Sequence, residues 1–224
     1  YGGDLALAGV PGAHVRPGRM GVEARRRELL ESGARLVLDA THPHAAEISR
    51  QLIALSRELD IPYLRFERPG TPAGEGAETC ASPEEAAARA IQLGSRIFLA
   101  TGSRDLPVFL GAPGAAERAW FARMTPDPQL LARAEALGIP RARLCAMQGP
   151  FTRDFNEALW RGWQIDCVVS KDSGEAGGFA AKRDAARALG IPLVVVARPA
   201  VEYPRVVNDA AAVHHFLDRM GALT

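Results

Sequence analysis

The chain has 224 residues, of which 47% are apolar and 24% are charged, a balance typical of a globular protein. Its formal net charge of +1 argues against a nucleic-acid-binding or membrane-surface protein, and no apolar run approaches the roughly 20 residues of a membrane span. Three cysteines lie far apart without metal-ligand spacing, and no signal peptide is visible, so we expect free thiols, no metal site and a cytoplasmic protein.

The first elements in chain order describe the beginning of an α/β domain. The chain opens at Tyr1 with no leading strand, so we expect a first domain that lacks its amino-terminal βα unit. A short apolar run over 35–41 predicts a buried strand, and apolar residues at helical spacing predict a helix over 45–59. A second strand is expected over 61–66. The Gly- and Pro-rich segment 69–80 is interpreted as an exposed crossing loop.

A strong helix start follows at Ser82. Its hydroxyl suits an N-cap, Pro83 suits the first helical position, and Glu85 completes a capping box. Gly94 ends this helix, and we place the domain boundary there, which divides the chain into residues 1–94 and 95–224.

Strands and helices alternate through the second half of the chain. The expected strands cover 96–101, 119–124, 143–147, 165–170 and 192–197. The expected helices cover 126–137, 153–160, 179–189 and 209–220. This alternation predicts an α/β fold in which helices cover both faces of parallel sheets.

Ligands of open α/β sheets bind beyond the carboxyl ends of the strands, so the loops at those ends are candidate sites. The first such loop carries Asp39, Thr41 and His42 immediately before a helix. Backbone N–H groups and the helix dipole favour an anion at this place. The alternative is that Asp39 and Thr41 only cap the helix while His42 lies on the surface, and the sequence leaves both open.

The second loop follows the strand that ends at Thr101. Gly102 allows a ligand to approach the backbone, Ser103 offers a hydroxyl, and Arg104 can bind a phosphate or carboxylate with two N–H groups. An ordinary strand-to-loop turn explains these residues equally well.

The third loop joins an apolar strand to a helix near Phe179 and is the most informative of the three. It contains Ser173, three glycines and Lys171, while the chain has only one other lysine, Lys182. A glycine-rich loop before a helix can hold an anion, although the P-loop and G-x-G-x-x-G patterns are absent. We expect Lys171 to contact a negatively charged ligand, and we expect all three loops to face one cleft.

Together these residues resemble the precorrin-6A reductases, a family that includes the cobalt-precorrin-6A reductases. The resemblance runs from about residue 33 to the end of the chain. It rests on Asp39-Ala40-Thr41-His42-Pro43, Thr101-Gly102-Ser103-Arg104, Gly149-Pro150-Phe151, Lys171-Asp172-Ser173-Gly174, Gly177-Gly178 and Arg198-Pro199. It implies two Rossmann-like domains with a cleft, and the NADPH-dependent reduction of precorrin-6A to precorrin-6B in cobalamin biosynthesis. The family's usual first strand and Gly-Gly-Thr-type loop are not found here.

The candidate loops supply residues for these roles. We expect cofactor binding by Thr41, Gly102, Ser103 and Arg104, and we expect NADPH to be preferred over NADH because these loops offer no obvious acidic partner for the ribose. We expect the tetrapyrrole-derived substrate to contact His42, Lys171, Ser173, Gly174, Gly177, Gly178 and Arg198. The proton that follows the hydride would come from Asp39, His42, Lys171 or water. Two alternatives stay open at this point: a phosphosugar or nucleotide-sugar transferase, and an inactive remnant that binds the macrocycle.

Overall fold

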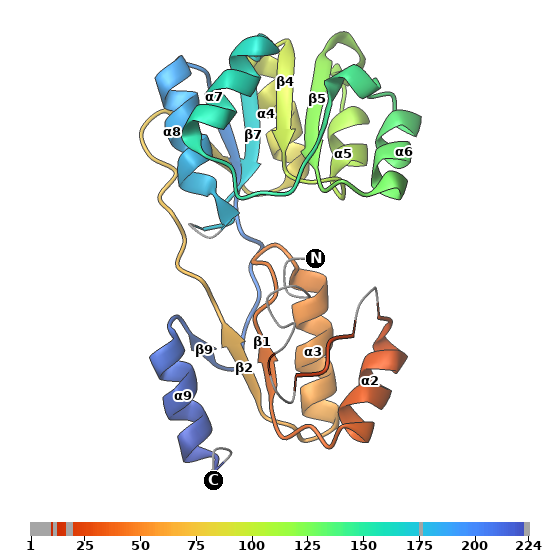
Figure 1. The fold of residues 1–224 in the computed structure, drawn as a ribbon, viewed down its shortest axis with the longest axis vertical. Coiled ribbons are helices and arrows are strands. Elements are labelled where there is room, and N and C mark those ends of the chain that lie inside the picture. Colours follow the sequence, from red (N-terminus) through yellow and green to blue (C-terminus); the bar gives the residue numbers. More distant parts are fainter. Residues whose placement is uncertain (1–9, 11–12, 17–19, 175–176, 222–224) are drawn as a thin grey trace.

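The computed structural model describes residues 10, 13–16, 20–174 and 177–221, and it confirms an α/β fold with parallel sheets. Figure 1 shows two lobes joined by extended segments. One contains a six-stranded sheet and the other a three-stranded sheet, and we name the lobes accordingly. The expected loss of an amino-terminal βα unit concerns residues 1–9, which lie outside the described part of the chain.

The six-stranded lobe contains most of the core. Its strands run in the order β3-β8-β7-β4-β5-β6, and every pair is parallel. They are β3 (Ala77–Cys80), β4 (Arg96–Ala100), β5 (Ala119–Met124), β6 (Leu144–Ala146), β7 (Cys167–Lys171) and β8 (Leu193–Val196). Continuous apolar runs such as Ile97-Phe98-Leu99 suit these strands because helices bury both faces of the sheet.

Helices cover the six-stranded sheet on its two faces, and each face has its own apolar cluster. One face packs against α4 (Pro83–Leu93), α5 (Leu106–Leu110) and α6 (Pro128–Ala136). The other packs against α7 (Arg153–Gly162) and α8 (Phe179–Leu189). Two short 3-10 turns, η1 (Ala115–Glu117) and η2 (Arg141–Arg143), complete the lobe. Every helix in the described ranges is too short or too polar to span a bilayer.

The three-stranded lobe is built from both ends of the described chain. Its strands run in the order β1-β2-β9 and are parallel. They are β1 (Val37–Asp39), β2 (Tyr63–Phe66) and β9 (Val206–Val207), and the helices are α2 (Val22–Glu31), α3 (Ala46–Glu58) and α9 (Ala210–Arg219). Val37, Ile53 and Tyr63 form a small buried core, and Val201 and Tyr203 from the returning segment pack against it.

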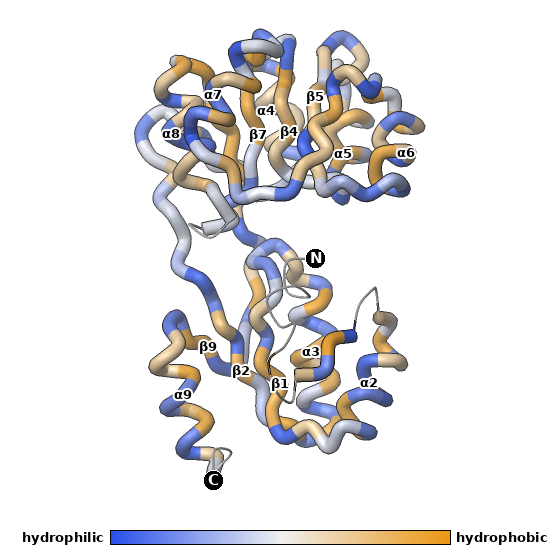
Figure 2. Tube along the Cα trace, viewed as in Figure 1, coloured by the Kyte–Doolittle hydropathy of each residue, from blue (hydrophilic) through white to orange (hydrophobic). Residues whose placement is uncertain are grey.

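The chain crosses between the lobes twice, and this corrects the expected boundary at Gly94. It leaves the three-stranded lobe along 67–76 and returns along 197–205, segments whose extended course is visible in Figure 1. Figure 2 shows the first of them as mostly hydrophilic or neutral. β3 and α4 therefore belong to the six-stranded lobe, while β9 and α9 belong to the three-stranded lobe. Segment 69–80 was expected to be a loop throughout, but its last four residues form β3.

Local signals in the sequence set the ends of several elements as expected. The Ser82 hydroxyl accepts a hydrogen bond from the Glu85 amide at 3.2 Å and caps α4. The Glu85 carboxylate reaches back to the Ala81 amide at 2.7 Å, one residue before the position of an ideal capping box. These contacts fix the start of α4 directly after β3.

Gly94 packs tightly against Asp166 and Cys167 inside the six-stranded lobe. A substitution at Gly94 therefore tests whether this residue belongs to the interior of that lobe. A Cβ at Gly94 would come within 2.5 Å of the Asp166 Oδ1 atom and 2.6 Å of the Cys167 Cβ atom. We therefore expect Gly94→Ala to lower the free energy of unfolding by about 1–3 kcal/mol, as overpacking does. Denaturant unfolding followed by circular dichroism measures the change.

Gly162→Ala is the matched control for this measurement, because no atom lies within 4 Å of its added Cβ. We expect that variant to stay within about 1 kcal/mol of the parent protein. Equal stabilities of the two variants would contradict the packing of Gly94 against β7.

Candidate functional site

The three loops singled out in the sequence meet in one cavity of about 400 Å³, which we call the interlobe pocket. They follow β1, β4 and β7, so the pocket lies at the carboxyl ends of strands from both lobes. The three-stranded lobe contributes His42, His44 and Ala45. The six-stranded lobe contributes Ala100, Thr101, Gly102, Arg104, Lys171, Ser173, Gly177 and Lys182.

Asp39 ends β1, but it is buried and does not line the pocket. The Tyr63 hydroxyl donates to Asp39 Oδ2 at 2.6 Å, and the Thr41 hydroxyl donates to Oδ1 at 2.7 Å. Burial alone would raise the pKa of Asp39, but hydrogen bonds from Ser49, Tyr63 and Thr41 outweigh it and lower that pKa. Thr41 also accepts a hydrogen bond from Arg65 at 3.0 Å. Asp39 and Thr41 thus anchor the loop, and neither forms part of the pocket wall.

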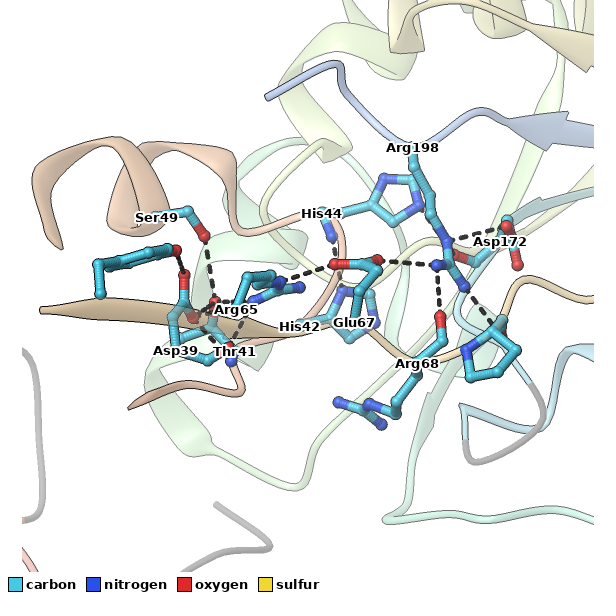
Figure 3. A network of polar contacts seen from close by, with 12 residues as sticks. Asp39, Thr41, His42, His44, Ser49, Arg65, Glu67, Arg68, Asp172 and Arg198 are labelled. Atoms are coloured by element: carbon cyan, nitrogen blue, oxygen red, sulfur yellow. Dashed lines mark hydrogen bonds and ion pairs between the residues drawn. The ribbon is translucent and has the colours of Figure 1, made fainter. Parts of the chain in front are cut away.

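A row of five alternating charges connects the two lobes, and we call it the charge chain (Figure 3). Arg65, with a side chain only 1% exposed, lies 2.9 Å from Asp39 Oδ1 and 2.6 Å from Glu67 Oε2. Glu67 Oε1 lies 2.8 Å from Arg198 Nη1, and Arg198 Nε lies 2.9 Å from Asp172 Oδ2. Arg198 was expected to bind substrate, but its guanidinium is directed to these two carboxylates.

His42 and His44 form the wall of the pocket on the side of the three-stranded lobe. The His44 amide donates to His42 Nδ1 at 3.1 Å, and His44 Nε2 lies 3.2 Å from the carbonyl oxygen of Asp172. Burial lowers the pKa of both imidazoles to about 4, with further repulsion from Lys171. Both rings are therefore neutral at pH 7 and can form hydrogen bonds without adding charge.

The loop after β4 offers an unpartnered hydroxyl and an open backbone position to a ligand. The Thr101 hydroxyl is buried without a hydrogen-bond partner among the described residues. Gly102 has a φ of +81° and open space where a Cβ would stand, so a ligand can lie against its backbone. The exposed Arg104 pairs with Glu47 of α3 across the lobes. Ser103 belongs to the same loop but does not line the pocket.

The loop after β7 holds Lys171 more firmly than the sequence suggested. Lys171 Nζ lies 2.6 Å from Asp105 Oδ2, and both side chains are 15% exposed. Lys171 is therefore a half-buried member of an ion pair, and within the described residues its negatively charged partner is a side chain of the protein itself. Ser173 donates to the carbonyl oxygen of Gly177 at 3.1 Å, and a Cβ on Gly177 would lie 2.2 Å from that serine.

Gly174 and Gly178 shape the same loop without forming part of the pocket wall. Gly174 has a φ of +69° and lies so close to the Pro69 carbonyl oxygen that a Cβ would approach it to 2.9 Å. Gly178, with a φ of +66°, is the N-cap of α8. Both positions favour glycine because their backbones are left-handed.

Sequence reasoning missed three features of this site. Arg65 and Glu67 lie at the end of a strand that was treated as structural, and no pattern pairs them with partners far along the chain. His44 lies two residues after the candidate His42, and its position alone does not show that it lines the pocket. Lys182 had a usable signal, because it is one of only two lysines in a chain rich in arginine.

Comparison with known proteins identifies one family. Residues 2–218 match the family described as precorrin-6x reductase CbiJ/CobK. The chain is 35% identical over 206 residues to a cobalt-precorrin-6A reductase of Priestia megaterium, covering 91% of this chain and 80% of that protein. It is 35% identical over 199 residues to a precorrin-6A reductase of Rhodobacter capsulatus, covering 86% of this chain and 76% of that protein.

A solved structure agrees with these sequence relatives. The chain is similar to a CobK precorrin-6A reductase with a TM-score of 0.74 and 30% identity. The similarity covers 92% of this chain and 81% of that one. Both lobes and the pocket between them fall within the part of the chain that the family match spans.

The neutral histidines of the pocket predict a specific dependence of stability on pH. Each has a pKa of about 4 in the folded protein and about 6.5 when unfolded. Between these values the unfolded chain binds more protons, so the free energy of unfolding should fall as the pH drops from 6.5 to 4. The double variant His42→Asn/His44→Gln should flatten the curve in that window, as measured by denaturant unfolding at each pH.

The pH window separates this effect from that of Asp39. Its pKa lies below the usual value of 3.8, so its contribution to stability is lost only at lower pH. If the free energy of unfolding of the double histidine variant falls between pH 6.5 and 4 as steeply as that of the parent protein, the two imidazoles are not buried in their neutral form.

Proposed function

Because the chain belongs to the precorrin-6x reductase family, we propose that it reduces one ring double bond of precorrin-6A or its cobalt form in cobalamin biosynthesis. The chain is thus an oxidoreductase and not a sugar transferase. The observation that carries the proposal is the family match over residues 2–218, which spans both lobes of the interlobe pocket. The relatives include reductases of both substrate forms, so the proposal covers both.

We assign NADPH as the cofactor, and when bound it supplies the hydride. The loop after β4 fits a dinucleotide. The Thr101 hydroxyl lacks a partner within the described residues, and the Gly102 backbone is open to a ligand. The Arg104 guanidinium lies at the rim in an exposed ion pair with Glu47, and a surface pair of this kind is weak enough to be exchanged for two N–H contacts to a phosphate. A cation at that rim favours NADPH over NADH, because only NADPH carries the additional phosphate.

The loop after β7 fits the acceptor, a macrocycle ringed by carboxylates. Lys171 and Ser173 face the pocket together with Gly177, while His42 approaches from the other lobe. A neutral imidazole can donate a hydrogen bond to a carboxylate or accept one from a ring N–H. Gly174, Gly178 and Arg198 hold the shape of the loop rather than reach the ligand.

Of the candidate proton donors, Lys171 fits best. Asp39 is deprotonated and does not line the pocket, and His42, with a pKa of about 4, carries no additional proton at pH 7. Lys171 presents an ammonium group to the pocket, and Asp105 holds that group in place at 2.6 Å. We therefore assign to Lys171 the proton that follows the hydride, with solvent restoring it afterwards.

We place this reaction in the cytoplasm. The three cysteines, Cys80, Cys145 and Cys167, are free and buried. Burial raises the pKa of each thiol. The pKa of Cys167 is raised to about 12. Unpaired thiols of this kind are typical of proteins in a reducing compartment.

A direct assay tests the function. On mixing the protein with precorrin-6A and NADPH, we expect the absorbance at 340 nm to fall and the product mass to rise by two hydrogens. NADH should bind roughly 10–100-fold more weakly, because it lacks one charge-assisted hydrogen bond. A protein that binds the macrocycle but never oxidises NADPH would instead be a binding protein.

The role of Lys171 is tested with a pair of variants in the same assay. Lys171→Met should slow the reaction and lower the melting temperature, because it leaves the Asp105 carboxylate without its cation. Lys171→Met/Asp105→Asn should restore the melting temperature but not the rate. Recovery of the parent rate in the double variant would show that Lys171 only stabilises the loop.

A further inference from the structure

Lys182 is a buried cation that the site described so far does not use. It lies in the first turn of α8 and lines the interlobe pocket, although its side chain has no more exposure than a core residue. Its relative exposure is 7%. Within the described residues its ammonium group forms no hydrogen bond and no ion pair. A buried ammonium in this position is costly unless an anion reaches it.

The surroundings of Lys182 leave this positive charge uncompensated. Arg123 on β5 is a second buried cation, and its polar partner is the neutral side chain of Asn156 at 2.8 Å. Asp172 is the acidic group that favours the charge of Lys182, but it is already held by Arg198 at 2.9 Å. Burial and repulsion from Arg123 lower the pKa of Lys182 to about 8.

The other titratable groups at the pocket do not supply the missing negative charge. His42 and His44 are neutral at pH 7, and Asp105 is held by Lys171. The amino end of α8 lies at the same place, since Gly177 also lines the pocket. The first turn of α8 contains no acidic residue, so the positive end of its dipole adds to the charge of Lys182.

We propose that Lys182 and the amino end of α8 form a subsite for one anionic group, a carboxylate or a phosphate, of the ligand in the interlobe pocket. The geometry supports this subsite because a buried, unpartnered ammonium and a helix amino end open into one cavity. It rests on the proposed function only for the source of the anion, which is either a carboxylate of the macrocycle or a phosphate of the dinucleotide.

Nuclear magnetic resonance can observe Lys182 directly, because the chain contains only two lysines. Protein labelled with ¹³C at lysine Cε should give two signals, which Lys171→Arg and Lys182→Arg assign. Without ligand we expect the pKa of Lys182 to be about 8. Uroporphyrin III serves as a probe that carries carboxylates around a macrocycle, and NADP⁺ serves as the phosphate probe.

An anion bound at the subsite favours the charged form, so the probe that occupies it should raise the pKa of Lys182. A rise with uroporphyrin III assigns the subsite to a carboxylate, and a rise with NADP⁺ assigns it to a phosphate. A pKa of Lys182 that neither probe changes would overturn the proposal.

Variants separate a binding role from a structural one. Lys182→Met should weaken binding of the assigned probe roughly 10–100-fold while leaving the melting temperature unchanged or higher, because it removes an unpaired buried charge. Arg187→Met, on the same helix with a side chain 77% exposed, is the matched control and should bind like the parent. If Lys182→Met instead lowers the melting temperature and leaves the affinity for both probes unchanged, the role of Lys182 is structural. Failure of NADPH oxidation while this binding persists would contradict the proposed function and not the subsite.

Discussion

A guanidinium buried as deeply as that of Arg65 needs carboxylates on more than one side, and this requirement organises the contact between the lobes. Asp39 satisfies it from β1 and Glu67 from the segment that leaves β2. Glu67 in turn binds Arg198, and Arg198 binds Asp172. Removing one partner of a buried pair leaves the other uncompensated, at a cost of about 3–5 kcal/mol. The charge chain thus ties both crossing segments to the loop after β7.

This arrangement decides what the pocket can do. Asp39 and Asp172 are each paired with an arginine, and no carboxylate lines the cavity within the described residues. The histidines are neutral, which leaves Lys171, Lys182 and Arg104 as the charged groups that line the cavity within the described residues. A pocket of this kind suits anionic ligands, and both a dinucleotide and a polycarboxylate macrocycle are anionic.

Much of the fold and the position of the site could be predicted from the sequence, because both depend on local patterns. Apolar strands such as 167–171 and the Ser82 cap are encoded within a few residues. The three loops could be found because parallel strands bring their carboxyl ends to one edge. The loops of both lobes then meet in one pocket, as expected.

The remainder depends on contacts between residues far apart in the chain. β9 has only two residues, too few for any hydrophobic pattern, so the return of the chain to the three-stranded lobe was not predictable. The same return separates Glu67 from its partner Arg198 by 131 positions. Pairing over such a distance leaves no trace in a single sequence. For that reason the sequence predicts a substrate contact for Arg198 and gives no sign of its pairs with Glu67 and Asp172.

The most direct test of this account is a double-mutant cycle between Glu67 and Arg198, two residues outside the pocket wall. The variants Glu67→Gln, Arg198→Gln and the double variant are compared by kcat/KM for NADPH oxidation with precorrin-6A. If the charge chain positions the two walls of the pocket, each single variant should lower kcat/KM. The double variant should then lose little more, with a coupling energy of about 0.5–3 kcal/mol. Single variants with the parent kcat/KM, or losses that simply add, would show that the pocket forms without this link between the lobes.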